Sequence, residues 1–456
     1  MAIEVDLNLV RKYNQPGPRY TSYPTAPQFK ESFTVSEWEE QIIRNNQSNP
    51  ADLSLYFHLP FCDTLCWFCG CTMIVTRNRD RIEEYIDYLI AEIDLVKSRL
   101  DPERKVVQLH FGGGTPTHLS PDQIRRLGAK INESFTFAED AEIGCEMDPR
   151  ELTREHIVAL REVGFNRASI GIQDFDLKVQ KATNRIHSKE LVQEVVGWIR
   201  DTGFHSLNFD LIYGLPFQTK ESFKKTLADI LDLQPDRLAV YGYAHVPWVK
   251  RHQKLIHEED LPKPEEKLEM LKMIIETLTA SEYVYIGMDH FAKEDNELAI
   301  AQREKTLQRN FQGYSTKAGA DIYAFGMSSI SQLHTAYAQN VKELPVYYQR
   351  VKEGVFPIER GLVLSRDDQI RGTVIMRLMC DMELVFDKIS ESLGIDFSDY
   401  FRKELTTLGE FEAEGLLIQD PEKIVVTEKG RLFIRNIAMT FDAYLDHTKA
   451  RYSKTI

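Results

Sequence analysis

The sequence predicts an α/β fold: a partial (β/α)6-type barrel, preceded by an N-terminal extended arm and followed by a mostly helical, winged-helix-like C-terminal domain. The first reason is that short apolar runs alternate with stretches of 3.6-residue apolar spacing every 30 residues or so, the pattern of βαβ units in a parallel sheet. The second is that no dinucleotide-binding fingerprint accompanies these units, which favours a full or partial barrel over a doubly wound sheet.

The strand-like runs begin near residue 53 and recur through the middle of the chain. They are Leu53–Leu59, Val106–Phe111, Ala141–Met147, Arg167–Ile172, Ser206–Ile212, Arg237–Tyr243 and Tyr283–Met288. Helical spacing is found between the earlier ones, over Ile82–Leu100, Gln123–Phe135, Thr153–Val163 and Leu191–Thr202. Because a barrel presents its functional groups at the C-terminal ends of its strands, we expect the active residues there.

The two ends of the chain differ from this middle part. Residues 1–50 are polar and irregular, with a proline- and tyrosine-rich stretch at Pro16–Pro24, so we expect an extended arm before a catalytic domain at 51–357. Residues 358–456 contain two helical stretches, then two short strand-like runs and a last helix, which together resemble a winged helix. Their ranges are Asp367–Leu384, Asp399–Leu408, Gly415–Gln419, Lys423–Thr427 and a helix from Lys429. Some winged helices bind DNA, but the acidic balance of this part favours a structural lid or cap.

Composition excludes several classes of protein. A hydrophobic fraction of 43% and a charged fraction of 28% are those of a globular chain with a sizeable core. No run of eighteen apolar residues predicts a membrane span and no apolar signal region begins the chain, so we expect a cytoplasmic protein. The net charge of −14 argues against nucleic acid or an anionic membrane as a partner.

The cysteines carry the strongest chemical signal. Four of the six lie within ten residues, and Cys62, Cys66 and Cys69 form a CxxxCxxC motif directly after the first predicted strand. Soft thiolates on one loop suit an iron–sulfur cluster, whereas zinc ribbons use a second CxxC knuckle that this chain lacks. The motif predicts a [4Fe–4S] cluster with one iron open to the amine and carboxylate of S-adenosylmethionine. We expect Cys71 to remain uncoordinated, with a fourth-ligand role as the alternative.

A glycine-rich segment follows the second predicted strand, and polar residues stand at the ends of the next four, which indicates a single cavity. The segment Gly112–Pro116 is either a ligand-binding turn or an ordinary tight turn, and the carboxylate of Glu146 suits ribose hydroxyls or an ammonium group. The later strand ends and the loops after them contribute Gln173, Arg185, Asp210 and Ala244.

Taken together, these motifs resemble the oxygen-independent coproporphyrinogen III oxidases of the radical S-adenosylmethionine superfamily, and the resemblance covers essentially the whole chain. It is carried by PGPRYTSYPTA (16–26), HLPFC…CWFCGC (58–71), GGGTPT (112–117), EMDPRE (146–151), GIQDF (171–175), DLIYGLP (210–216), YIGMDHFA (285–292), QRNFQGY (308–314) and TEKGRLFIRNIAM (427–439).

The resemblance implies that two propionates of coproporphyrinogen III become vinyl groups, with two S-adenosylmethionine molecules in the site. The residues implied to contact the cluster-bound molecule are Tyr56, Gly113, Glu146 and Ile330. Those implied to contact the second are Phe68, Gly114, Thr115, Gln173, Arg185, Asp210 and Ala244. It further implies a monomer that receives electrons from a donor such as flavodoxin or ferredoxin. Arg19, Tyr20, Arg303 and Arg309 are candidates for binding the substrate carboxylates.

Two alternatives remain from the sequence. One is a haem chaperone related to this family, which would keep the three-cysteine loop and bind haem without oxidising a porphyrinogen. The other is a DNA-binding module built on the C-terminal domain.

Overall fold

The computed structural model describes residues 5–47 and 50–445 and divides the chain into two compact units. The larger unit comprises 29–263 and 319–363; the smaller combines 1–28, 264–318 and 364–456. These units do not follow the three expected segments 1–50, 51–357 and 358–456. Instead, the smaller unit gathers the start of the chain, an internal segment and the C-terminal part.

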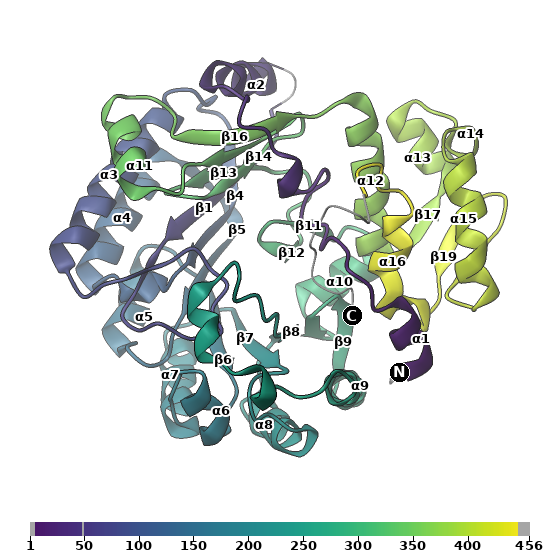
Figure 1. Cartoon of the computed structure of the whole chain (residues 1–456). Helices are drawn as coiled ribbons and strands as arrows, with labels where there is room; N and C mark the ends of the chain where they lie inside the picture. The colour runs from purple at the N-terminus through teal and green to yellow at the C-terminus, as the bar shows by residue number, and fades with distance from the viewer. Residues whose placement is uncertain (1–4, 48–49, 446–456) are drawn as a thin grey trace. The chain divides into compact units, whose positions relative to one another are not determined.

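The larger unit is built on one open sheet with the strand order β16-β15-β14-β13-β1-β4-β5-β6-β7-β8 (Figure 1). Its strands are β1 (Leu53–Leu59), β4 (Lys105–Gly113), β5 (Thr136–Met147), β6 (Arg167–Gln173), β7 (Ser206–Tyr213), β8 (Arg237–Gly242), β13 (Asp321–Phe325), β14 (Ile330–Gln332), β15 (Ala336–Asn340) and β16 (Ile358–Val363). The order is parallel from β13 to β8 and antiparallel from β13 to β16. The α/β class and the partial barrel are confirmed, and the barrel is not closed.

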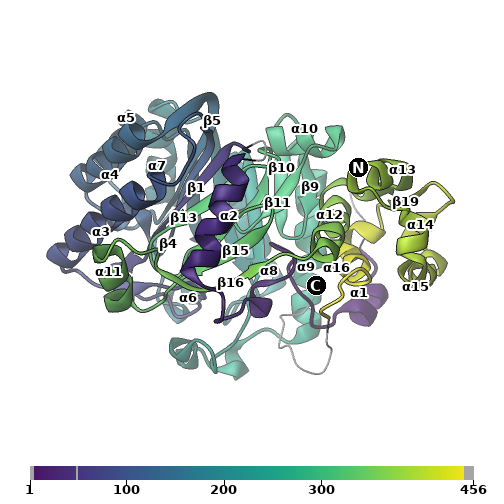
Figure 2. The same ribbon diagram turned by 90° about the horizontal axis from the view of Figure 1, so that it is seen from above.

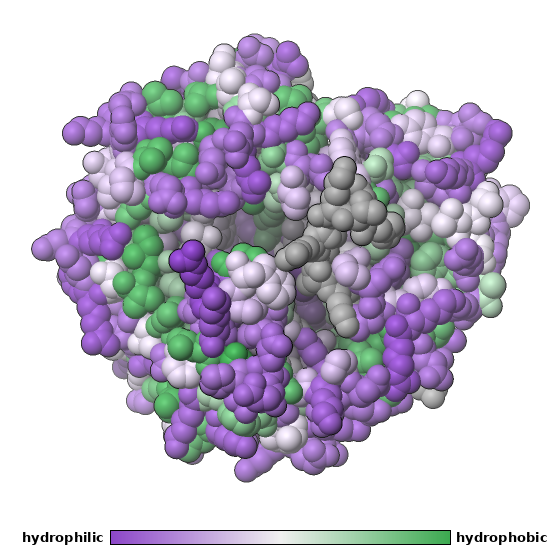
Figure 3. All heavy atoms as spheres, in the orientation of Figure 1, coloured by the Kyte–Doolittle hydropathy of each residue, from purple (hydrophilic) through white to green (hydrophobic). Residues whose placement is uncertain are grey.

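Helices connect the parallel strands, as crossover geometry requires. They are α3 (Arg79–Lys97), α4 (Pro121–Ser134), α5 (Arg154–Glu162), α6 (Leu177–Ala182), α7 (Lys189–Asp201) and α8 (Lys220–Asp232). Local sequence sets their ends: α4 begins with Pro121 after the N-cap Ser120, whose side chain forms a capping box with Gln123. In Figure 2, α3, α4, α5 and α7 lie on the outer side of the parallel strands. Figure 3 shows hydrophilic residues over much of the surface that faces the viewer, with hydrophobic ones among them.

The core lies between the sheet and these helices. Six of the seven residues of β1 are buried, and Phe57 stacks on Phe325 of β13 with ring centroids 4.5 Å apart. Phe57 also meets Phe111 of β4 edge to face at 5.4 Å. This packing fixes the register of β1 between its two neighbours, which places the loop after β1 at the C-terminal edge of the sheet.

The expectation that residues 1–50 are irregular is wrong in two places. The structure has α1 (Leu7–Tyr13) and α2 (Val35–Gln47) there; α2 lies along β15 and ends where residues 48–49 fall outside the described part. Trp38, Gln41 and Ile42 recur on one face of α2 and are buried, so helical spacing was present in the sequence. Residues 14–25 are irregular, as expected of an arm.

The run near residue 283 is also not a parallel strand. It forms β9 (Tyr283–Gly287), which pairs antiparallel with β10 (His290–Lys293) in the smaller unit. Only Met288 and Asp289 join them, too short a connection for a parallel crossover.

The rest of the smaller unit is mostly helical, and the expected hairpin of the C-terminal part is present. Its helices are α9 (Pro264–Ala280), α10 (Glu297–Glu304), α12 (Arg366–Asp381), α13 (Phe386–Leu393), α14 (Phe397–Tyr400), α15 (Arg402–Ala413) and α16 (Ile434–Met439). Its short strands are β11 (Gln308–Asn310), β12 (Gly313–Ser315), β17 (Glu383–Val385), β18 (Leu417–Gln419) and β19 (Lys423–Val426). The last three form an antiparallel sheet in the order β17-β19-β18, consistent with a winged-helix-like arrangement.

Candidate active site

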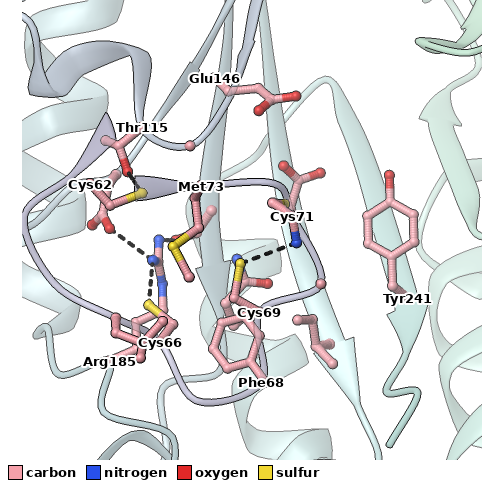
Figure 4. A pocket seen from close by; sticks show the side chains of 18 of the residues that line it. Cys62, Cys66, Phe68, Cys69, Cys71, Met73, Thr115, Glu146, Arg185 and Tyr241 are labelled. Carbon is pink, nitrogen blue, oxygen red and sulfur yellow. Dashed lines mark hydrogen bonds and ion pairs between the residues drawn. The ribbon is translucent and has the colours of Figure 1, made fainter. Parts of the chain in front are cut away.

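A cavity of about 500 Å³ lies within the larger unit, at the C-terminal ends of its parallel strands. The cysteine loop forms one wall, and residues at the ends of β4 to β8 form the others. Figure 4 shows the sulfur atoms of Cys62, Cys66 and Cys69 turned toward one space. The expected gathering of strand-end residues around one cavity is therefore present.

The cysteine loop is held in place from two sides by later parts of the same unit. On one side, the Trp67 amide donates to the Thr183 carbonyl at 3.0 Å and the Asn184 side chain donates to the Leu65 carbonyl at 2.9 Å. On the other, the side chains of His252 and Gln253 bind the carbonyls of Cys69 and Phe68 at 2.7 and 2.9 Å. The loop therefore keeps its shape through contacts that do not involve the thiols.

Cys66 has the most polar surroundings of the three. Its Sγ accepts hydrogen bonds from Arg150 Nη2 at 3.3 Å and from Arg185 Nη1 at 3.5 Å. Asp148 bridges the two guanidiniums, with contacts of 2.6 Å to Arg150 and 2.8 Å to Arg185. Burial alone raises the pKa of Asp148, but the two guanidiniums hold it well below its usual range, so this carboxylate is ionised.

The other two thiols have fewer partners. Thr115 Oγ1 donates to Cys62 Sγ at 3.4 Å, and the Cys71 amide donates to Cys69 Sγ at 3.4 Å. These donors and the guanidiniums at Cys66 suit thiolates. Within the described ranges, no three His, Cys, Asp or Glu side chains are grouped to hold a single metal ion. Three soft donors spread along the wall of one cavity fit a cluster of several irons.

The glycine segment after β4 passes very close to the loop after β1. A Cβ on Gly114 would lie 2.5 Å from the Pro60 carbonyl oxygen, and Gly113 has a φ of +114°. The Gly114 amide donates to the Leu59 carbonyl at 2.9 Å, and the Gly113 amide to Glu146 Oε2 at 3.3 Å. The glycines therefore serve the protein's own packing, although both also line the cavity.

Glu146 and Asp210 place two carboxylates in the cavity. Glu146 accepts from Nε2 of His110 at 3.2 Å; burial acts to raise its pKa, but His110 and the Gly113 amide bring it below the usual value. Its side chain is 45% exposed, to the cavity. Burial, then repulsion from Glu146, raises the pKa of Asp210 to about 6, although Ser169 donates to it at 2.9 Å. One acid is therefore fully ionised near neutral pH, and the other titrates just below it.

Two polar atoms in this cavity are buried without a hydrogen-bond partner: Gln173 Oε1 and Arg185 Nε. Gln173 also has a φ of +69°, in the left-handed region that residues other than glycine rarely adopt. Buried polar atoms without partners are uncommon in folded proteins and suit a site that receives a polar ligand.

Most residues predicted for the site meet in this cavity, and two do not line it. Those that line it are Cys62, Cys66, Phe68, Cys69, Gly113, Gly114, Thr115, Glu146, Gln173, Arg185, Asp210 and Ala244. Tyr56 is on β1, where its ring stacks on His110 of β4 with centroids 6.1 Å apart. Ile330 lies on β14 and pairs with Gln339.

Sequence reasoning missed several cavity residues. Asp148 and Arg150 follow Glu146 directly, but only their contact with Cys66 shows what they do. Ser169 and Tyr241 also line the cavity, on β6 and β8. For Ser169 the available signal was the alternation of polar and apolar residues along β6, whereas Tyr241 stands in the mainly apolar run of β8.

The candidates for carboxylate binding all belong to the smaller unit, and each has a partner there. Arg19 forms an ion pair with Asp289, and the Tyr20 hydroxyl donates to Asp442 at 2.9 Å. Arg303 donates to the Glu294 carbonyl at 2.9 Å, and Arg309 lies over the Tyr314 ring at 4.8 Å. Their role toward the substrate remains a prediction.

Comparison with known proteins agrees with this geometry. Residues 56–230 match the family model of the radical SAM superfamily, and residues 364–433 match that of the HemN C-terminal domain. The chain is 48% identical to the oxygen-independent coproporphyrinogen III oxidase of Helicobacter pylori J99, over 99% of both chains. It is also 48% identical to that of Escherichia coli K12, over 98% of this chain and 97% of the relative.

A solved structure gives the same result. The Escherichia coli coproporphyrinogen III oxidase HemN, described as a radical SAM enzyme, superposes with a TM-score of 0.93 at 46% identity, covering 98% of this chain and all of the other. Among the helices of the described part, none is long and apolar enough to cross a membrane. The chain belongs to the oxygen-independent coproporphyrinogen III oxidase family of the radical S-adenosylmethionine superfamily.

Proposed function

We propose that this chain converts coproporphyrinogen III to protoporphyrinogen IX without oxygen. Two propionate side chains become vinyl groups. Each propionate loses one hydrogen atom and releases one CO₂, and one electron passes to an external acceptor. The observation that carries the proposal is the single cavity that joins the three cysteines to the strand-end residues, in a chain nearly half identical to enzymes named for this activity.

Cys62, Cys66 and Cys69 hold a [4Fe–4S] cluster in this proposal, and the fourth iron position remains for S-adenosylmethionine. When bound, the cluster and S-adenosylmethionine supply a 5′-deoxyadenosyl radical that removes a β-hydrogen from a propionate. The residues of the chain bind and orient these groups and exclude water from the cavity.

Two molecules of S-adenosylmethionine occupy the cavity in this proposal. The cluster-bound one contacts Gly113 and Glu146 in the cavity and also Tyr56 and Ile330, which lie outside the cavity lining; the ionised carboxylate of Glu146 suits its ribose hydroxyls or its ammonium. The second contacts Phe68, Gly114, Thr115, Gln173, Arg185, Asp210 and Ala244. The buried atoms of Gln173 and Arg185 without partners support this assignment, because a polar ligand would satisfy them.

The remaining parts of the proposal rest on the resemblance to the family. We infer a cytoplasmic monomer that receives electrons from a donor such as flavodoxin or ferredoxin. Cys71 remains outside the ligand set, and a Cys71→Ser protein is expected to keep the optical signature of the cluster. Loss of that signature would make Cys71 the fourth ligand.

The test is anoxic reconstitution with iron and sulfide, followed by S-adenosylmethionine, a reductant, coproporphyrinogen III and cell extract as electron acceptor. Chromatography of the oxidised porphyrins is expected to show protoporphyrin with the wild type and none with Cys66→Ser. 5′-Deoxyadenosine without protoporphyrin would contradict the substrate assignment. Tight stoichiometric haem binding without turnover would favour the haem-chaperone alternative.

A further inference from the structure

Arg150 is anchored by its own neighbours so that one edge of its guanidinium faces Cys66. Its Nε donates to Asp148 at 3.0 Å, its Nη2 to the same carboxylate at 2.6 Å, and its Nη1 to the Asn184 carbonyl at 3.3 Å. Nη2 also lies 3.3 Å from Cys66 Sγ. All three nitrogens of the Arg150 guanidinium therefore have contacts, and one of these contacts is with the sulfur of Cys66.

The position of Arg150 is coupled to that of the cysteine loop. Asn184, whose carbonyl accepts from Arg150, donates through its side chain to the Leu65 carbonyl beside Cys66. The Arg150 side chain is 17% exposed and that of Asp148 is 9% exposed, so solvent screens their charges only in part. The guanidinium therefore acts on this thiolate from a fixed distance.

Arg185 differs from Arg150 in a way that separates two roles. It also approaches Cys66 and Asp148, but its Nε is buried without a partner next to the cavity. Arg185 therefore has a donor left for a ligand, whereas every nitrogen of Arg150 is engaged within the protein. A change at Arg150 acts on the sulfur without removing a predicted ligand contact.

We propose that Arg150 is a positioning residue that raises the reduction potential of the cluster through its hydrogen bond to the Cys66 thiolate. The inference rests on the proposed function, because it requires Cys66 to be a cluster ligand. Hydrogen bonds to cluster sulfurs and nearby positive charge set such potentials, since reduction adds negative charge that they stabilise. Asp148 cancels one of the two positive charges of Arg150 and Arg185, so removal of Arg150 leaves this group beside Cys66 without net positive charge.

The test is a potentiometric titration of the reconstituted cluster, followed by the EPR signal of the reduced form, in the wild type, Arg150→Gln and Arg150→Lys. At the potential where half of the wild-type clusters are reduced, Arg150→Gln is expected to show about a tenfold lower ratio of reduced to oxidised cluster. For a one-electron couple this is a shift of about 59 mV to a more negative potential. Arg150→Lys keeps the charge without the fork and is expected to lie between the two.

Arg77→Gln is the matched control. Arg77 pairs with Asp63 beside Cys62 and carries the same charge, but its side chain is 80% exposed and its guanidinium contacts Asp63 rather than a sulfur. Its potential is expected to equal that of the wild type. Equal reduction potentials in the wild type and Arg150→Gln would overturn the inference. It would also be overturned if Arg150→Gln lost the cluster while the cluster of Arg150→Lys kept the wild-type potential. Absence of a cluster in the wild type would instead contradict the proposed function.

Discussion

Asp148→Asn should destabilise the folded chain strongly, because it removes the carboxylate that pairs with two guanidiniums. Asp148 accepts from Arg150 at 2.6 Å and from Arg185 at 2.8 Å, and the Asp148 and Arg185 side chains are each 9% exposed. Breaking one partner of a buried ion pair leaves an uncompensated charge and costs about 3–5 kcal/mol. Since Arg150 is 17% exposed and partly screened, we expect about 3 kcal/mol.

The loss of stability caused by Asp148→Asn also has an expected dependence on pH. The pKa of Asp148 in the folded chain lies well below its unfolded value, so its stabilisation is complete above the unfolded pKa and is lost only as the pH falls through the folded one. The loss caused by Asp148→Asn should therefore be constant between about pH 5 and pH 8.

The assay is urea unfolding of the cluster-free chain under anoxia, followed by far-UV circular dichroism at several pH values. Asp122→Asn serves as control: Asp122 pairs with Arg125 at the surface and is 95% exposed, so its removal should cost less than about 0.5 kcal/mol. Equal losses in the two variants would refute the assignment of a buried charge network at Cys66, as would a loss for Asp148→Asn that disappears between pH 8 and pH 5.

Three further outcomes are expected. Burial raises the pKa of Glu92 to about 7, so the free energy of unfolding of the wild type should fall as the pH rises from 5 to 8. In urea titrations, Glu92→Gln should remove about 2–3 kcal/mol of that fall, and an unchanged dependence of stability on pH would contradict this. Gly114→Ala should lower the thermal midpoint and the iron content after reconstitution, because its Cβ would lie 2.5 Å from the Pro60 carbonyl oxygen; a wild-type midpoint would show that the loop adapts. Burial and Glu146 raise the pKa of Asp210 to about 6, so binding of S-adenosylmethionine, measured by equilibrium dialysis, should strengthen from pH 5 to 7.5 in the wild type and stay flat in Asp210→Asn.

The parallel half of the sheet could be predicted because its strands have a regular local signal. The run Leu53–Leu59 matches β1 residue for residue, and Arg167–Ile172 matches β6 to within one residue. Strands β13 to β16 are short and carry no comparable periodicity, and β13 joins β1 across more than 250 residues of chain. Pairing over such a distance depends on tertiary packing, for example of Phe57 on Phe325, which local patterns do not contain.

The candidate site could be predicted where a motif fixes the chemistry. The spacing of Cys62, Cys66 and Cys69 and the polar strand ends placed most of the predicted residues around one cavity. The contact of Arg150 with Cys66 could not be predicted, because 84 residues separate them and an arginine after a strand is more often solvated. The role of the glycines could be predicted only in part. Position 114 needs glycine because the Pro60 carbonyl lies too close for a Cβ, and the sequence does not show that these residues are neighbours.

In the proposed reaction, the adenosyl radical acts on the propionate side chains of coproporphyrinogen III. Its most direct test is turnover of a substrate deuterated at the propionate β-carbons, with mass spectrometry of the 5′-deoxyadenosine formed and an α-deuterated substrate as control. We expect deuterium in 5′-deoxyadenosine from the β-labelled substrate and none from the α-labelled one. Protoporphyrin formed from the β-labelled substrate with unlabelled 5′-deoxyadenosine would contradict it.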